Sequence, residues 1–167
     1  DGLGVMFWRM PTFYRCRSVS DIRGQAERVP LVGKGTNTVY ADRDGEILWT
    51  QLGGGRRGVC APKTPYCAAT GYRPLIGEAV TEKEVAERNR WLRVMGLGAD
   101  ASVGGRDPVA DVKAILCDHC VVDGHPDSSP CRRDGPENAT QYSLVLDLLE
   151  RRLYYCGQPD DRRWRTV

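Results

Sequence analysis

The sequence predicts an α+β fold in which antiparallel β-hairpins come first, about three helices follow, and disulfides stabilise the chain. Short segments rich in strand formers and broken by turn residues fill the first half. Helix-start signals and apolar residues at helical spacing dominate the second half. The length of 167 residues fits a single compact domain covering residues 1–167. Seven cysteines are spread along the chain, a distribution typical of a disulfide framework: Cys16, Cys60, Cys67, Cys117, Cys120, Cys131 and Cys156.

The first elements that the sequence predicts are two short strands near the amino-terminal end. Residues 5–8 and 13–16 are rich in aromatic side chains, which favour strands. Pro11 lies between them and interrupts the pairing of a sheet. We therefore expect these strands at an edge or beside a turn.

A β-hairpin is predicted over residues 36–41 and 46–52, both of which are rich in strand formers. Asp44 and Gly45 lie between the two strands, and this pair suits a turn that requires positive φ. The glycines and arginines of residues 53–58 predict a flexible, basic loop after the hairpin.

Two helix starts are legible in the middle of the chain. Thr81 and Glu84 form a capping box, which predicts a helix that runs to about Met95 and stops at Gly96. Asp107 followed by a proline predicts a second start. The apolar face of that second element, which also fits a buried strand over residues 112–116, comprises Val109, Val112, Ile115 and Leu116.

A third helix is predicted from about residue 137 to about residue 155. Cys156 and Gly157 mark its end, where a disulfide would tie the helix to the rest of the fold. The helical spacing is carried by Tyr142, Val145, Leu146, Leu149 and Leu153.

Cysteine usage favours an exported protein, secreted or extracellular. Asn138 begins an Asn-Ala-Thr glycosylation sequon, and the sequence opens at Asp1, as a chain does after removal of a signal peptide. Seven is an odd number, so three intrachain disulfides leave one thiol for a disulfide-linked dimer or for chemistry. A local bridge between Cys60 and Cys67 would close a short loop.

Charge and hydropathy exclude some classes of partner. The chain has 24 Lys and Arg against 22 Asp and Glu, a net charge of +2, which does not favour nucleic acid. No apolar run approaches the roughly 20 residues that a membrane-spanning helix needs. We therefore expect no membrane span and a protein as the partner.

Residues 117–131 hold three cysteines and both histidines, which makes them the candidate site. The interpretation we favour is structural: the cysteines form disulfides, no cofactor is bound, and the rest is a surface turn. Zinc is the alternative cofactor, because thiolate and imidazole are its usual ligands. That set comprises Cys117, Cys120 and Cys131 with His125 or His119. The Cys-x-x-Cys pair also suits a redox role.

Hydrolytic chemistry is a further alternative for the same segment. His119 and His125 would act as acid and base, and Arg132 or Arg133 would bind a phosphate, as in a phosphodiesterase or ribonuclease. The function that we expect first is a secreted, disulfide-stabilised interaction domain, effector-like or receptor-like, that binds another protein. An exported hydrolase and a zinc-binding module follow in that order.

Overall fold

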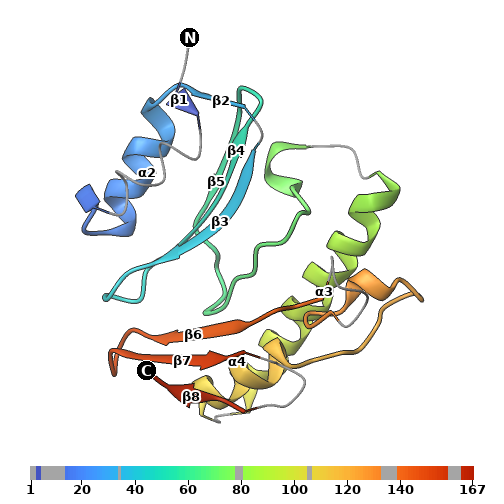
Figure 1. The fold of residues 1–167 in the computed structure, drawn as a ribbon. Coiled ribbons are helices and arrows are strands. Elements are labelled where there is room, and N and C mark those ends of the chain that lie inside the picture. Colours follow the sequence, from blue (N-terminus) through green and yellow to red (C-terminus); the bar gives the residue numbers. More distant parts are fainter. Residues whose placement is uncertain are drawn as a thin grey trace. The chain divides into compact units, whose positions relative to one another are not determined.

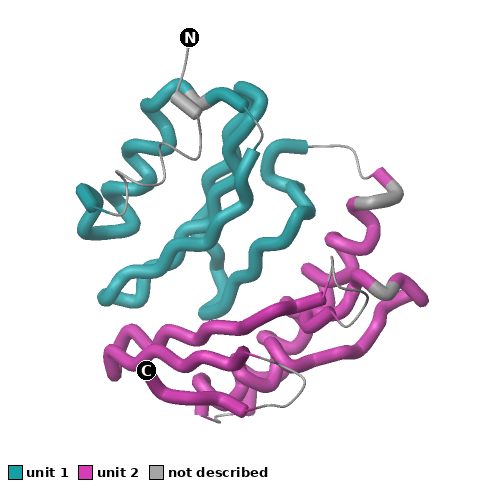
Figure 2. The backbone as a smooth tube through the Cα atoms, viewed as in Figure 1, with its two compact units in different colours: residues 1–79 teal, residues 80–167 magenta. Residues whose placement is uncertain are grey.

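The computed structural model describes residues 3–4, 14–33, 35–77, 81–104, 107–132, 139–157 and 163–167. Helices and two small antiparallel sheets confirm the mixed α+β class (Figure 1). The chain divides into two compact units, residues 1–79 and residues 80–167 (Figure 2). The expectation of a single domain stays a prediction. No helix in the described ranges is long and apolar enough to cross a membrane.

Unit 1 is a three-stranded antiparallel sheet of order β3-β4-β5 with one helix on it. A short parallel pair, β1 with β2, accompanies this sheet. The predicted hairpin is confirmed in β3 and β4, which pair over their whole length. The elements are β1 (Leu3–Gly4), α2 (Val19–Arg28), β2 (Leu31–Val32), β3 (Thr36–Ala41), β4 (Ile47–Gly53), β5 (Arg56–Cys60) and the 3₁₀ helix η1 (Pro74–Ile76).

Helix α2 was not predicted, although its start carries a clear local signal. Ser18 and Asp21 form a capping box, with Asp21 in place of the more usual glutamate. At the other end the Arg57 guanidinium, from β5, donates to the carbonyls of Ala26 and Glu27. A cation there satisfies carbonyls that lack helical partners. The helix packs its apolar side on the sheet, in a core of Val19, Ala26, Tyr40, Leu48 and Leu52.

The opposite face of this sheet is covered by the segment that follows β5. Asn37, on β3, donates to the carbonyls of Thr70 and Tyr72 at 2.7 Å each. Gln51, opposite Asn37 on β4, donates to Tyr72 and accepts from the Leu75 N–H at 2.7 Å. These bonds supply buried backbone groups with partners, so a strand-like segment lies flat on the sheet without joining it.

Unit 2 contains two helices, α3 and α4, which pack against each other, and a second antiparallel sheet of order β6-β7-β8. Helix α4 packs against β6, and the Lys113 ammonium lies 3.5 Å from the centre of the Tyr154 ring on β7. The elements are α3 (Glu82–Val103), α4 (Pro108–Leu116), the 3₁₀ helix η2 (Pro126–Ser128), β6 (Ser143–Asp147), β7 (Arg152–Cys156) and β8 (Arg165–Thr166).

Both predicted helix starts are confirmed. The Glu84 carboxylate accepts from the Thr81 N–H at 2.7 Å, and the Asp107 carboxylate accepts from the Val109 N–H at 2.9 Å. The predicted stop at Gly96 is wrong, since α3 continues to Val103. A glycine inside a helix costs only about 1 kcal/mol, which packing of α3 on α4 offsets. The alternative of a strand over residues 112–116 is also wrong, because those residues belong to α4.

The third predicted helix is wrong: the segment forms the hairpin of β6 and β7. Its apolar residues fit a helical period and an alternating period equally well, and the turn decides between them. The Asp147 carboxylate accepts from the N–H groups of Leu149 and Glu150 at 3.0 Å each, which ends β6. Arg151 closes the loop in the left-handed region, with φ of 54°. The order of strands and helices therefore differs from the prediction.

Two expectations for the first half are also corrected. Residues 53–58 are not a flexible loop, because Gly54 and Gly55, with φ of 59° and 76°, make the two-residue turn between β4 and β5. Tyr14 and Arg15 are helical rather than extended. The strand predicted at residues 5–8 lies outside the described residues.

The expected disulfides are not seen. All seven cysteines lie in the described ranges, and none is joined to another in the structure. Cys117, Cys131 and Cys156 are fully buried, so these sulfurs contribute to the structure as small apolar side chains. Disulfide stabilisation stays a proposal.

Candidate functional site

The predicted site, residues 117–131, is a compact loop anchored on one side of α3. Arg90 is the main anchor, with a side chain only 12% exposed. Its guanidinium donates to the carbonyls of Ser129, at 3.1 Å, and Asp127, and pairs with the Glu87 carboxylate at 2.9 Å. Burial lowers the pKa of Arg90, and the Glu87 carboxylate opposes that shift. The charge is therefore buried with a full set of partners.

Two neighbours on α3 hold the start and the middle of the loop. The Arg93 guanidinium contacts both oxygens of Asp118, at 2.8 and 3.3 Å, and this hydrogen bonding raises the pKa of Arg93. Asn89, which is buried, donates to the Asp123 carboxylate at 3.2 Å. The part of α3 that carries residues 89–93 is thus occupied by the loop.

The loop also satisfies its own polar groups. Asp123 and Gly124 adopt φ of 53° and 70°, and they form a tight turn that bridges Val122 to His125. The buried Ser128 hydroxyl accepts from the Val122 N–H at 2.7 Å and lies 2.6 Å from the His125 carbonyl. These contacts are those of a structural turn.

The residues of the predicted hydrolase have different partners. His119 Nδ1 lies 2.9 Å from the Cys131 carbonyl, which only accepts, so Nδ1 carries a proton in this contact. The His125 side chain is exposed. The Arg132 guanidinium lies 3.6 Å from the Asp127 carboxylate. Arg133 lies outside the described residues. The hydrolase stays a prediction that these contacts do not strengthen.

The predicted zinc ligands are not assembled. Cys117 and Cys131 are buried whereas Cys120 is exposed. In the parts of the chain that the structure describes, no three or more Cys, His, Asp or Glu side chains are grouped to hold a metal ion. The zinc site stays a prediction.

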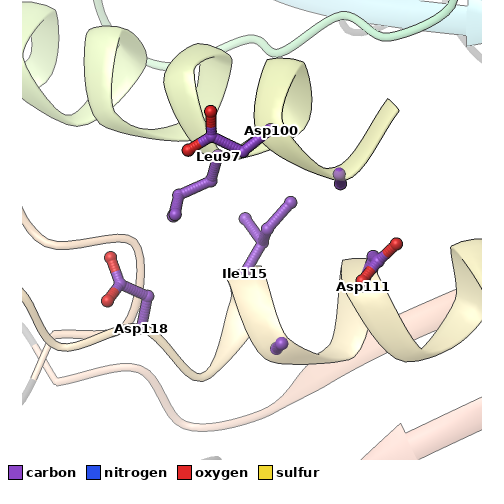
Figure 3. Close-up of a pocket in the computed structure, with 7 residues that line it drawn as sticks. Leu97, Asp100, Asp111, Ile115 and Asp118 are labelled. Atoms are coloured by element: carbon purple, nitrogen blue, oxygen red, sulfur yellow. The ribbon is translucent and has the colours of Figure 1, made fainter. Parts of the chain in front are cut away.

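A pocket of about 470 Å³ opens between α3 and α4 (Figure 3). Its floor is apolar and three carboxylates surround it, a combination that suits an aliphatic chain with a cationic end. One of these carboxylates, Asp118, is already paired with Arg93. The lining residues are Leu97, Asp100, Ala101, Asp111, Ala114, Ile115 and Asp118.

The most conspicuous surface of unit 2 is one face of the hairpin of β6 and β7. Leu144 and Leu146, next-but-one neighbours on β6, are 49% and 61% exposed. Leu144 pairs with Tyr155 and Leu146 pairs with Leu153 across the hairpin, so these side chains share a face. We call this surface the apolar face, and it comprises Tyr142, Leu144, Leu146, Leu153 and Tyr155.

The two sides of this sheet differ in burial. The Tyr142 ring stacks on Tyr155, with centroids 6.4 Å apart. On the side that α4 covers, Ser143, Val145 and Cys156 are buried. The sheet therefore already has a packed core side, and its apolar face is an additional, open surface.

Arginines border the apolar face. Arg165 on β8 pairs with Tyr155 and thus projects on the same side of the sheet. Arg163, two residues before Arg165 in the chain, and Arg151, in the loop between β6 and β7, are also exposed, and Glu150 is the acidic residue of that loop. We call Arg151, Arg163 and Arg165 the arginine rim.

The apolar face was not identified from the sequence because its residues were assigned to the buried side of a helix. Buried and exposed positions alternate along residues 143–147 in the structure, but residues 144–146 are all apolar, so the sequence of this strand shows no such alternation. Comparison with models of known protein families, with curated proteins and with solved structures gave no match.

The environment of Cys67 lowers the acidity of its thiol. Burial, and secondarily the nearby Cys60, raises the pKa of Cys67 from 9.0 to about 11. At pH 8 its thiolate fraction should be roughly 100-fold below that of an unperturbed thiol. We expect iodoacetamide to modify Cys67 far more slowly than the exposed Cys120, measured by peptide mass spectrometry. Equal rates at the two sites would contradict this environment.

The same shift predicts a pH dependence of stability. Because the pKa is higher in the folded state, the folded state binds the proton more tightly than the unfolded chain. This contribution is complete below about pH 9 and is lost as the pH rises through about 11. Cys67→Ala should flatten that part of the stability profile, measured by urea unfolding between pH 8 and 11.

Proposed function

We propose that this protein is an extracellular interaction domain that binds a protein partner through the apolar face of β6 and β7. The observation that supports this proposal is the continuous row of exposed leucines and tyrosines on a sheet whose other side is already packed. Exposed apolar patches of several hundred Å², bordered by polar residues, mark sites of protein interaction.

The composition of the apolar face suits binding to protein. Leucine at the centre supplies surface whose burial contributes about 25 cal/mol per Å². Tyr142 and Tyr155 add rigid aromatic area with a polar tip, the type of side chain enriched among residues that dominate binding energy. A flat two-stranded surface of this kind fits a helix or a second sheet better than it fits a small molecule.

The arginine rim specifies the chemistry of the partner. Among the described residues of the loop between β6 and β7 and of residues 163–167, the exposed charged side chains are Arg151, Arg163 and Arg165 and the acidic Glu150. Charges at the border of an interface determine which partner is accepted and how fast it associates. We therefore infer that the partner presents an apolar patch bordered by Asp or Glu.

The proposed extracellular location is supported by features of the sequence other than the apolar face. The seven distributed cysteines and the sequon at Asn138, which lies outside the described residues, support an extracellular location. An extracellular binder also needs no catalytic group, in keeping with the structural role of the contacts in residues 117–131.

Replacing the leucines of the apolar face tests the proposal. The tagged full chain is incubated with extracellular proteins of its source, and bound proteins are quantified by mass spectrometry. Leu144→Asp with Leu146→Asp should reduce recovery of the partner at least 30-fold, because two central apolar contacts are lost and acidic repulsion is added. Val103→Asp is the matched control, since Val103 is 88% exposed at the end of α3.

The comparison with Val103→Asp shows whether the loss of binding is specific to the apolar face. Wild type and Val103→Asp should recover the same protein, and that protein should carry a surface of the predicted acidic and apolar composition. Equal recovery of every protein by the leucine variant and by Val103→Asp would refute a role for the apolar face.

A further inference from the structure

We propose that Cys60 and Cys67, of the seven cysteines, form an intrachain disulfide that closes the loop of residues 61–66. The inference concerns unit 1 and does not depend on the apolar face of unit 2. It selects one pair from the many connectivities that seven cysteines allow.

The register of the sheet sets the direction of Cys60. Cys60 ends β5 and pairs with Trp49 on β4, so the two side chains lie on the same face of the sheet. The Trp49 indole donates to the Asn37 side chain on that face. Asn37 in turn donates to the Thr70 carbonyl, three residues after Cys67.

The chain that contains Cys67 returns over the sheet face that carries Cys60. After β5 the chain leaves the sheet, turns, and returns to lie across the face that carries Trp49 and Cys60. Six residues join the two cysteines, and two of them, Pro62 and Pro65, restrict the backbone. The Thr64 hydroxyl donates to the Tyr66 carbonyl at 2.7 Å, which stabilises the turn. The Cys60 sulfur is close enough to disfavour charge on Cys67.

Cys60 and Cys67 are more exposed to solvent than the three buried cysteines. Cys117, Cys131 and Cys156 are 2%, 1% and 0% exposed, whereas Cys60 and Cys67 are both partly exposed. Access is needed because exchange proceeds by attack of a thiolate on a disulfide sulfur. Cys60 and Cys67 are therefore more accessible to an oxidant than Cys117, Cys131 and Cys156.

The reaction is thiol–disulfide exchange with an external disulfide. One cysteine thiolate attacks a sulfur of the external disulfide, and the first external thiolate leaves. The second cysteine thiolate then attacks the mixed disulfide, and the second external thiolate leaves. The two cysteines are oxidised by two electrons, the external disulfide is reduced to two thiols, and the two protons pass to those thiols.

The test oxidises the full chain with oxidised glutathione, blocks remaining thiols with iodoacetamide, and digests it with trypsin. Cleavage after Lys63 separates the two cysteines, because Lys63 lies between them. We expect a linked pair of peptides, residues 58–63 with residues 64–83, about 2 Da lighter than the two reduced peptides together. Oxidation should also raise the melting temperature by about 5 °C.

Serine variants show which cysteines form the disulfide. Cys60→Ser and Cys67→Ser should each abolish the linked peptides and the rise in melting temperature, whereas Cys120→Ser should change neither. The wild-type peptide map answers the question even where a serine variant fails to fold. Recovery of Cys60 and Cys67 as alkylated thiols, or linked to other cysteines, would overturn the proposal. Binding through the apolar face is measured separately, so failure of either proposal is distinguishable.

Discussion

Replacing Arg90 with alanine should lower the free energy of unfolding of unit 2 by about 3 kcal/mol, one of the two largest effects that we expect. The guanidinium serves two carbonyls, those of Asp127 and Ser129, and one carboxylate, that of Glu87. Alanine leaves all three acceptors without this donor, and they lie where the side chain is only 12% exposed. Urea unfolding followed by circular dichroism measures the change.

Arg88 supplies the control for this experiment, because it is an exposed arginine two residues away on the same helix. Arg88→Ala should change the free energy of unfolding by no more than about 0.5 kcal/mol. A similarly small effect of Arg90→Ala would mean that the loop of residues 117–131 does not depend on Arg90 for its position.

The second large effect should come from Gly58→Ala, which we expect to cost about 1–3 kcal/mol. A Cβ at this position on β5 would lie 2.3 Å from the Cβ of Leu75 and 3.0 Å from its carbonyl oxygen. The clash involves the backbone and Cβ of Leu75 within η1, so neither residue can move away by a change of rotamer. Removing the outer atoms of Leu75 in a double variant should not rescue stability, because the Leu75 Cβ remains.

Gly96→Ala is the matched glycine variant. Gly96 lies within α3 and has open space at its Cβ position. The substitution should stabilise the protein by about 0.5–1 kcal/mol, because alanine favours the helix. Thermal unfolding of both variants should give shifts of opposite sign, and destabilisation by both would show that the two glycines are not distinguished by packing.

Local signals made several elements predictable. Asp44 and Gly45 located the turn between β3 and β4, and Gly45 does adopt a positive φ of 83°. The capping residues Thr81 and Asp107 located two helix starts. Each of these signals acts within about four residues of the chain, so it is readable without knowledge of the rest of the fold.

Features that depend on distant residues were not predictable from one sequence. Arg90 and Ser129, which are joined by a hydrogen bond, lie 39 positions apart in the chain. No sequence pattern indicates that these two residues are in contact. The hairpin of β6 and β7 was missed because its spacing also fits a helix, and the bonds of Asp147 to the loop decided the outcome. The same error hid the candidate site, since the apolar face exists only when Leu144 and Leu146 lie on a strand.

Site-specific photo-crosslinking at Leu146 tests the proposed binding surface most directly. A photoreactive phenylalanine derivative is placed at Leu146, and at Val103 as the control, in the full chain exposed to extracellular proteins of its source. A partner that covers the apolar face should give one discrete crosslinked product from position 146 and none from position 103. The same product from both positions, a crosslink only within the chain itself, or no product from position 146 would contradict binding through the apolar face.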